Sequence, residues 1–260
     1  MELKDKIAII TGGGRGIGRA IALALAREGA DVVVVARTES ELRQVASDIE
    51  SNGRRSLVVV ADISVPEQIE VMVDTAIGEF GRLDVLINNS GIQGPIVTVS
   101  DMDLEGWTQT LAVNLTGAML CAKYVLKKSM IPRRSGVIVN ISSASGRRGP
   151  ANRSPYSSSK FGMVGLTQSL AMEVGRQGIR VNCIAPGLVE TDLTVRMLRE
   201  ASEQLNRPYE RLVASINART ALDRMVTPEE VAALAVFLAS EKSSGITGQT
   251  VNCGAGLEMD

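Results

Sequence analysis

The chain has 260 residues, 45% of them hydrophobic, and a formal net charge of −1. That length fits one large α/β domain or two small ones, and the near-zero charge gives no general attraction to nucleic acids or anionic membranes. Histidine is absent, which excludes Ser-His-Asp and Cys-His catalysis and removes the commonest nitrogen ligand for metals. We therefore expect acid–base chemistry from Tyr, Lys, Asp or Glu, and no metal site.

The cysteines and the N-terminus indicate where the protein works. Cys121, Cys183 and Cys253 are far apart in apolar or strand-like runs, so neither a disulfide framework nor a zinc ribbon is indicated. The first residues run directly into a strand-like segment without the apolar core of a signal peptide. No uncharged apolar stretch approaches the roughly 20 residues of a membrane helix. We expect a soluble protein of the reducing cytosol.

Apolar β-branched runs alternate with segments of helical period along the chain. Because continuous apolar strands between helices are typical of a parallel sheet covered on both faces, the pattern predicts one Rossmann-like, doubly wound α/β domain over residues 1–260. The expected strands, each with its following helix, are 6–11 with 17–28, 31–36 with 40–51, 56–61 with 66–80, 83–88 with 104–128, 136–142 with 156–176, 179–185 with 228–240, and a last strand at 248–251.

Residues 188–219 interrupt this alternation with a charged helical stretch. Insertions at the carboxyl ends of strands in such folds tend to become lids over the ligand crevice. We expect this segment to be a substrate loop or lid.

The segment Thr11–Gly18 reads TGGGRGIG and connects the first strand to a helix. In that position glycines let the backbone approach a pyrophosphate at a helix N-terminus. Gly12, Gly16 and Gly18 have the spacing GxxxGxG, which differs from the commoner dinucleotide pattern GxGxxG. A purely structural turn is the alternative, but the position after the first strand favours cofactor binding by this turn, including Arg15 and Ile17.

Over essentially its whole length the sequence resembles the short-chain dehydrogenase/reductase family. The pattern and length are similar to the family's 3-oxoacyl-thioester reductases. Ser90 stands where the family usually has Ala, which exchanges one small residue for another. The motifs that follow the TGxxxGxG turn, in the family's order, are Asp62, Asn88-Asn89-Ser90-Gly91, Asn114, Ser143, Tyr156-xxx-Lys160, and Pro186-Gly187 with Thr191.

The resemblance implies an oxidoreductase that transfers a hydride between a nicotinamide and a carbonyl or secondary alcohol. Asp62 and Ile63 would then contact the adenine, and Asn89 would support the sheet and the cofactor. From the residues alone, Asp62 could instead cap a turn, and Asn88-Asn89 could close a strand end. The remaining cofactor contacts that the resemblance implies are Gly91, Tyr156, Lys160, Pro186, Gly187 and, at the nicotinamide, Val189 and Thr191.

Tyr156 and Lys160 are four residues apart on an expected helix, so their side chains share one face. A phenol of ordinary pKa, about 10, is a poor base at neutral pH, and a nearby ammonium favours the phenolate. We interpret Tyr156 as the general acid/base and Lys160 as its electrostatic activator. In the family this lysine also binds the nicotinamide ribose.

A second YxxxK copy spans Tyr124 to Lys128. The residue thirteen positions before Tyr156 is Ser143, at the end of an apolar strand, whereas Leu111 occupies that position before Tyr124. A hydroxyl at a strand end can polarise the substrate oxygen, as the family's serine does. We therefore interpret Tyr124 as a half-buried helix residue.

Ser142 and Asn114 also have competing interpretations. Ser142 and Ser143 point to opposite sides of a strand, and the family's spacing selects Ser143 for catalysis. Asn114 lies on a helix with apolar neighbours, where an amide is commonly a core polar group. The resemblance makes it the fourth catalytic residue, which links Lys160 to a chain of water molecules.

The end of the second strand indicates the form of the cofactor. A carboxylate there binds the ribose 2′-hydroxyl in NAD enzymes, and an arginine nearby accommodates the 2′-phosphate of NADP. Here Arg37 and Thr38 follow the strand with no acid before Glu39, and Arg15 could reach the same phosphate. We expect a preference for NADP(H), with NAD(H) possible. The alternative is that both arginines are solvated surface charges.

Basic residues provide two hypotheses about the substrate. Arg153 lies just before Tyr156 and the inserted segment carries Arg196 and Arg199, so converging arginines would bind an anionic substrate tail. The alternative is that they are solvated or pair with acids of the insertion. A carrier-protein substrate would need a basic patch beside the cleft. The acids of the insertion are Glu190, Glu200 and Glu203. One candidate for the basic patch is the group Lys127, Lys128, Arg133 and Arg134, although such a run is commonly a solvated helix end.

A protein that senses NADP(H) without turnover is an alternative from another class. The intact Ser143, Tyr156 and Lys160 argue against it, because a sensor does not need an acid–base group. The partners expected are a small carbonyl or alcohol substrate and further copies of the chain. The resemblance implies a homotetramer packed through the helices at 104–128 and 156–176.

Overall fold

Seven of the apolar runs form one parallel sheet in the computed structural model, which describes residues 1–257. The strand order is β3-β2-β1-β4-β5-β6-β7, so the doubly wound sheet predicted from the sequence is confirmed. The strands are β1 (Ile7–Thr11), β2 (Asp31–Ala36), β3 (Ser56–Val60), β4 (Val85–Asn88), β5 (Gly136–Ile141), β6 (Ile179–Pro186) and β7 (Thr250–Cys253).

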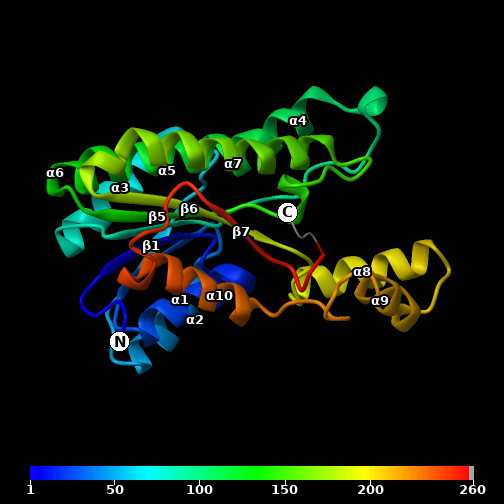
Figure 1. The fold of residues 1–260 in the computed structure, drawn as a ribbon, viewed down its shortest axis with the longest axis horizontal. Helices are drawn as coiled ribbons and strands as arrows, with labels where there is room; N and C mark the ends of the chain where they lie inside the picture. The colour runs from blue at the N-terminus through cyan, green and yellow to red at the C-terminus, as the bar shows by residue number, and fades with distance from the viewer. Residues whose placement is uncertain (258–260) are drawn as a thin grey trace.

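Helices cover both faces of the sheet (Figure 1). One layer contains α1 (Gly16–Arg27), α2 (Glu39–Ser51) and α10 (Pro228–Ala239), and the other contains α3 (Pro66–Phe80), α5 (Gly117–Val125) and α7 (Ser154–Val174). Successive strand residues point to opposite faces. In β1, Ala8 and Ile10 join one core cluster while Ile7 and Ile9 join the other. Both faces are therefore buried, which explains the unbroken apolar strands.

The strand order reverses between β1 and β4, which are neighbours in the middle of the sheet. In open α/β sheets, ligands bind in the crevice outside the carboxyl ends of the strands at such a point. Residues 188–219 lie at this end of the sheet, where they form α8 (Asp192–Gln204) and α9 (Tyr209–Asn217). Leu198, Leu212 and Met225 form a small core cluster of their own under these helices.

The helix expected at 104–128 differs from the prediction in detail. Its backbone is helical from α4 (Leu104–Leu111) through α5 to α6 (Ile131–Arg133), but π-helical turns interrupt it at Ala112–Thr116 and Leu126–Met130. Such turns are frequent at functional sites, and the first of them contains Asn114. The last strand also begins later than expected, because Gly248 has a φ of 73°.

None of the helices within residues 1–257 combines the length and the apolar character that crossing a membrane requires.

Candidate active site

Lys160 lies buried beside the phenol ring of Tyr156. Its side chain is on the second turn of α7 and is 3% exposed. Its Nζ donates to the carbonyl oxygen of Ile141, at the end of β5, over 2.8 Å. The same atom is 5.7 Å from the centre of the Tyr156 ring. The strand end thus holds an ammonium group next to the phenol, as the helical spacing of the two residues predicted.

Asn114 is fully buried and its amide is held by three hydrogen bonds. Its Oδ1 accepts from the backbone nitrogen of Ile92, and its Nδ2 donates to the carbonyl oxygen of Ile92, both over 2.8 Å. Nδ2 also donates to Ser159 Oγ over 3.0 Å. A Cβ on Gly91 would lie 3.4 Å from Asn114 Oδ1 and 3.5 Å from Lys160 Nζ. The backbone after β4 therefore brings Asn114 and Lys160 together.

Ser159 was not singled out from the sequence. Its hydroxyl donates to the carbonyl oxygen of Tyr156 over 2.7 Å and accepts from Asn114, so it connects α7 to the π-helical turn. A serine that bonds the backbone one turn earlier is common in helices. Only the folded structure shows that Asn114 is its second partner.

The two serines after β5 have different surroundings. Ser142 is buried and its Oγ donates to the carbonyl oxygen of Lys160 over 2.8 Å. Ser143 is half-buried, and its Oγ accepts from the backbone nitrogen of Ser145 over 3.1 Å. Ser142 therefore fixes α7 against the end of β5. Ser143 keeps its hydroxyl hydrogen for another acceptor, such as a substrate oxygen.

The glycine-rich turn has the geometry of a pyrophosphate site. Gly12 and Gly16 have φ angles of 66° and 53°, which favour glycine. The helix α1 begins at Gly16 with no side-chain cap at Arg15, so amide groups of its first turn are available to an anion. Asn89 Nδ2 donates to the carbonyl oxygens of Thr11 and Gly12 over 3.0 and 3.1 Å. These residues fit the pyrophosphate of a dinucleotide cofactor.

Thr191 brings the segment after β6 to this turn. Its Cγ2 would be 3.5 Å from a Cβ on Gly16, and its Oγ1 accepts from Thr194 at the start of α8. Val189 is buried and pairs with Val226 in an isolated bridge. Gly187 packs closely on Gly254, because a Cβ on Gly187 would lie 2.7 Å from Gly254 Cα.

Both arginines proposed for the 2′-phosphate lie near carboxylates. Arg37 Nη1 is 3.7 Å from Asp62 Oδ2, and Arg15 Nη1 is 3.7 Å from Glu41 Oε1. The two arginine side chains remain 68% and 71% exposed, so at these distances and exposures the ion pairs are weak and a phosphate group can compete for them.

Asp62 caps a turn, which is the alternative that the sequence left open. Its Oδ1 accepts from the backbone nitrogen and the hydroxyl of Ser64 over 2.9 and 2.7 Å. Burial raises the pKa of the Asp62 carboxyl, but the Ser64 hydrogen bonds and the charge of Arg37 outweigh it, so the pKa lies below its ordinary value. The carboxylate thus orders the turn that contains the buried Ile63.

The second YxxxK copy lies outside the site. Tyr124 is half-buried on α5, against the core cluster that α3 and α5 share. Its partner Lys128 is 2.7 Å from Glu70 Oε1 and 2.8 Å from Asp74 Oδ1, both on α3. Burial, followed by the charge and hydrogen bond of Glu70, raises the pKa of the Tyr124 hydroxyl. That environment does not favour a phenolate.

The candidate basic patch for a carrier protein does not lie beside the crevice. Lys127, Lys128, Arg133 and Arg134 lie around α6, at the end of the molecule opposite to α8 and α9 (Figure 1). Lys128 pairs with α3, and Arg133 Nη1 is 2.8 Å from the buried Asp84 Oδ1. Lys128, Arg133 and Arg134 bond other parts of the fold, and all four residues lie at the end of the molecule away from α8 and α9.

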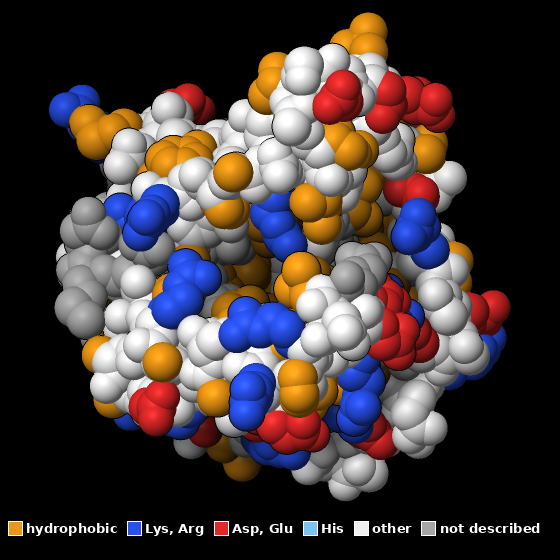
Figure 2. Space-filling view, turned by 90° about the vertical axis from the view of Figure 1, so that its right-hand side faces the viewer, with side chains coloured by type: hydrophobic (Ala, Val, Ile, Leu, Met, Phe, Trp, Pro, Cys, Tyr) orange, Lys and Arg blue, Asp and Glu red, His pale blue; other side chains and the backbone are white. Residues whose placement is uncertain are grey.

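Arg153 and Arg196 lie on segments that follow the carboxyl ends of β5 and β6. Arg153 is half-buried at the start of α7, and Arg196 is exposed on α8. Within residues 1–257 neither forms an ion pair, so the expected alternative of pairing with Glu190, Glu200 or Glu203 is not found; Arg199 instead lies 4.9 Å from the Tyr209 ring centre. Figure 2 shows Lys and Arg side chains around the hollow of this face.

A doubly wound sheet with a glycine-rich turn at its switch point, and a half-buried tyrosine beside a buried lysine, is typical of a nucleotide-dependent oxidoreductase. The family model described as enoyl-(acyl carrier protein) reductase matches residues 12–258. The short chain dehydrogenase/reductase astE of Aspergillus oryzae is 38% identical over 259 residues, which are 99% of this chain and 97% of that protein. The 3-oxoacyl-(acyl-carrier-protein) reductase FabG of Vibrio cholerae is 36% identical, with 100% of both chains covered.

Solved structures of oxidoreductases are also similar to this chain over nearly its whole length. Actinorhodin polyketide ketoreductase with NADPH has a TM-score of 0.93 and 35% identity over 98% of each chain. NAD⁺-bound xylitol dehydrogenase has a TM-score of 0.93 and 28% identity, over 98% of this chain and 100% of that one. The chain belongs to the short-chain dehydrogenase/reductase family, and it is an enzyme of the class that acts on carbonyl and alcohol groups with a nicotinamide cofactor.

Proposed function

We propose that the protein interconverts a ketone and a secondary alcohol with NADP(H), using Tyr156 as general acid and base. The observation that carries this proposal is the position of Lys160 Nζ, buried and 5.7 Å from the Tyr156 ring centre. When bound, the nicotinamide donates or accepts the hydride. The side chains of the protein donate and accept the proton.

Tyr156 gives its hydroxyl proton to the carbonyl oxygen during reduction, and takes it back during oxidation. The ammonium of Lys160 stabilises the phenolate that this transfer leaves behind. Ser143 donates a hydrogen bond to the same substrate oxygen and so stabilises the charge that develops on it. Asn114 holds the backbone at Ile92 and Gly91, which forms the wall next to Lys160.

A substrate panel tests the proposal. Ketones, sugars, acyl thioesters and alcohols are assayed with NADPH, NADH and their oxidised forms, and the nicotinamide absorbance is followed. Turnover of a carbonyl or alcohol supports the proposal. Tight NADPH binding with no turnover on any of these classes would support the sensing protein instead. The 3-oxoacyl-thioester reductases among the relatives make an acyl thioester the second candidate substrate.

The preference for NADP(H) depends on Arg37. Arg37→Asp is expected to lower kcat/KM for NADPH at least about tenfold, or roughly 1.4 kcal/mol, while kcat/KM for NADH changes little. The reason is that a carboxylate at this strand end repels a 2′-phosphate and can bond a 2′-hydroxyl. Arg43→Asp, at an exposed arginine on α2, the helix that follows Arg37, is the matched control. An equal loss of kcat/KM with NADPH and NADH would show that Arg37 does not select the 2′-phosphate.

We also propose that Arg153 and Arg196 bind an anionic tail of the substrate. Arg153→Ala and Arg196→Ala are each expected to raise KM for an anionic substrate at least about tenfold, near 1.4 kcal/mol, with little change for a neutral analogue. Arg176→Ala, at an exposed arginine just beyond the opposite end of α7, serves as control. Steady-state kinetics test this proposal. Equal changes in KM for the charged and the neutral substrate, or no change, would identify these arginines as surface residues.

We further propose a cytosolic homotetramer of single-domain subunits, with residues 188–219 as a lid. The side chain of Gln93, in the loop after β4, donates to Met197 Sδ on α8 over 2.8 Å, a contact across the crevice that a lid would make. The outer face of α4, α5 and α7 carries exposed apolar residues, as a subunit interface does. They are Leu104, Met119, Phe161 and Met172.

A further inference from the structure

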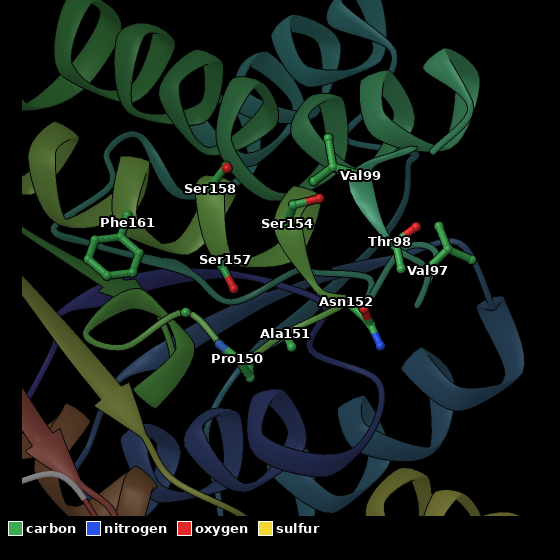
Figure 3. Close-up of a pocket in the computed structure, with 11 residues that line it drawn as sticks. Val97, Thr98, Val99, Pro150, Ala151, Asn152, Ser154, Ser157, Ser158 and Phe161 are labelled. Atoms are coloured by element: carbon green, nitrogen blue, oxygen red, sulfur yellow. The ribbon is translucent and has the colours of Figure 1, made fainter. Parts of the chain in front are cut away.

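The hollow beside the first turns of α7 has a place in the proposed assembly. Its volume is about 490 Å³, and Val97, Val99 and Phe161 are among the residues that line it (Figure 3). Phe161 lies on the exposed apolar face for which we propose a subunit contact. A side chain with no role in that contact or in the proton chemistry lies beside the glycine-rich turn, and it is the carboxylate of Glu41.

Glu41 is held against the glycine-rich turn by packing. It lies in the first turn of α2 and is half-buried. A Cβ on Gly14 would lie 3.0 Å from Glu41 Cβ and 3.2 Å from Glu41 Oε2, so the glutamate side chain fills the space that this glycine leaves. The next residue, Leu42, is fully buried in the core. Because Leu42 anchors α2, the carboxylate stays beside the turn.

The same carboxylate holds Arg15, one of the two arginines proposed for the 2′-phosphate. Glu41 Oε1 is 3.7 Å from Arg15 Nη1, and the arginine side chain is 71% exposed. Among the residues that the structure describes, neither of the two forms another ion pair. Arg15 therefore has one anionic partner before the cofactor binds, and that partner is Glu41.

The other arginine, Arg37, is in a different position. Its partner Asp62 also accepts two hydrogen bonds from Ser64, so Asp62 keeps partners when Arg37 turns to a phosphate. Glu41 has no such second partner within residues 1–257. When a phosphate binds Arg15, Glu41 must share one guanidinium with a second anion, and like charges close together repel each other.

We propose that Glu41 is a specificity-determining residue, which competes with the 2′-phosphate of NADP(H) for Arg15 and so lowers the affinity for NADP(H) alone. This inference rests on the proposed preference for NADP(H). NAD(H) has a hydroxyl in place of the phosphate and makes no demand on the charge of Arg15, so Glu41 leaves its affinity unchanged. The wild-type protein thus discriminates less between the two cofactors than Arg15 and Arg37 alone would.

Adenosine 2′,5′-bisphosphate and adenosine 5′-monophosphate are the probes, because they differ only in the 2′-phosphate and neither takes part in hydride transfer. Isothermal titration calorimetry on the full chain, at low ionic strength where screening is least, measures both dissociation constants. Glu41→Gln keeps the size of the side chain and removes its charge. It is expected to tighten binding of the bisphosphate about threefold, the effect of one exposed ion pair. Binding of the monophosphate is expected to stay within about 1.5-fold of the wild type.

Glu39→Gln is the matched control. It removes the same charge from the same first turn of α2, where Glu39 pairs with Arg43 and not with Arg15. This variant is expected to bind both probes as the wild type does, which separates Glu41 from any effect of net charge or of the helix N-terminus. Thermal unfolding checks that both variants fold.

A second pair of variants tests whether the effect passes through Arg15. Arg15→Ala is compared with the double variant that also carries Glu41→Gln. Without the guanidinium there is nothing to compete for, so the two are expected to bind the bisphosphate within about 1.5-fold of each other.

Four results would overturn the proposal. The first is equal affinity of Glu41→Gln and the wild type for the bisphosphate, and the second is an equal gain in Glu39→Gln. The third is a gain that persists without Arg15. The fourth is weaker binding of the monophosphate by Glu41→Gln, which would show that Glu41 bonds the ribose 2′-hydroxyl. The NADP(H) preference itself is tested separately, because it fails if the wild type binds the bisphosphate no more tightly than the monophosphate.

Discussion

Tyr156→Phe is expected to abolish measurable turnover while NADP(H) binding persists. The substitution removes one oxygen atom and leaves the ring beside Lys160 Nζ. A positioned general acid or base contributes roughly 10²–10⁴-fold to a rate, and water cannot replace a donor fixed on the catalytic helix. The loss is expected in kcat, whereas the dissociation constant of NADPH, measured by its fluorescence, stays within about twofold of the wild type.

Tyr124→Phe is the matched control, because the sequence contains the same YxxxK spacing there. This hydroxyl lies near Glu70 on α3, outside the catalytic group, so turnover is expected to remain nearly intact. An inactive Tyr124→Phe enzyme beside an active Tyr156→Phe enzyme would reverse the assignment of the two motifs.

The sheet and the order of its elements could be predicted because they depend on local pattern. Strands buried on both faces are apolar at every position, and each is followed by a segment of helical period. The glycine-rich turn was recognisable for a related reason, since it needs residues with positive φ at fixed positions between a strand and a helix. Both the apolar pattern of the strands and the glycine spacing of the turn involve residues that are close together in the sequence.

Contacts between distant segments could not be predicted in this way. The bond from Lys160 to Ile141 and the bond from Asn114 to Ser159 join elements that only the folded sheet brings together. The π-helical turn at Asn114 has no distinct periodicity in the sequence. The contact of Glu41 with Gly14 and Arg15 is likewise visible only once α2 is packed beside the glycine-rich turn.

The candidate basic patch lies away from the crevice for a geometrical reason. Residues 127–134 follow the helices that begin at Leu104, near the crevice, and a helical residue advances by about 1.5 Å. Roughly 25 helical residues therefore carry the chain nearly 40 Å along the helical layer. A charge run can thus be close to the site in sequence and far from it in space.

The glycine-rich turn can be tested at Gly18, where a side chain has no room. A Cβ there would lie 2.1 Å from the carbonyl oxygen of Gly12 and 2.5 Å from Asn89 Nδ2. The first of these atoms belongs to the backbone of the glycine-rich turn and the second fixes that turn to the end of β4, so neither can move without opening the turn.

Gly18→Ala is therefore expected to weaken NADPH binding at least about tenfold and to lower the free energy of unfolding by roughly 1–3 kcal/mol, the usual cost of overpacking. Gly78→Ala is the control, because a Cβ on this glycine of α3 meets no atom within 4 Å. Alanine is favoured over glycine in a helix, so that variant is expected to be slightly more stable and to bind NADPH normally. Fluorescence titration and thermal unfolding measure both effects. If Gly18→Ala bound NADPH as tightly as Gly78→Ala, the cofactor's pyrophosphate would have to lie elsewhere than on the turn between β1 and α1.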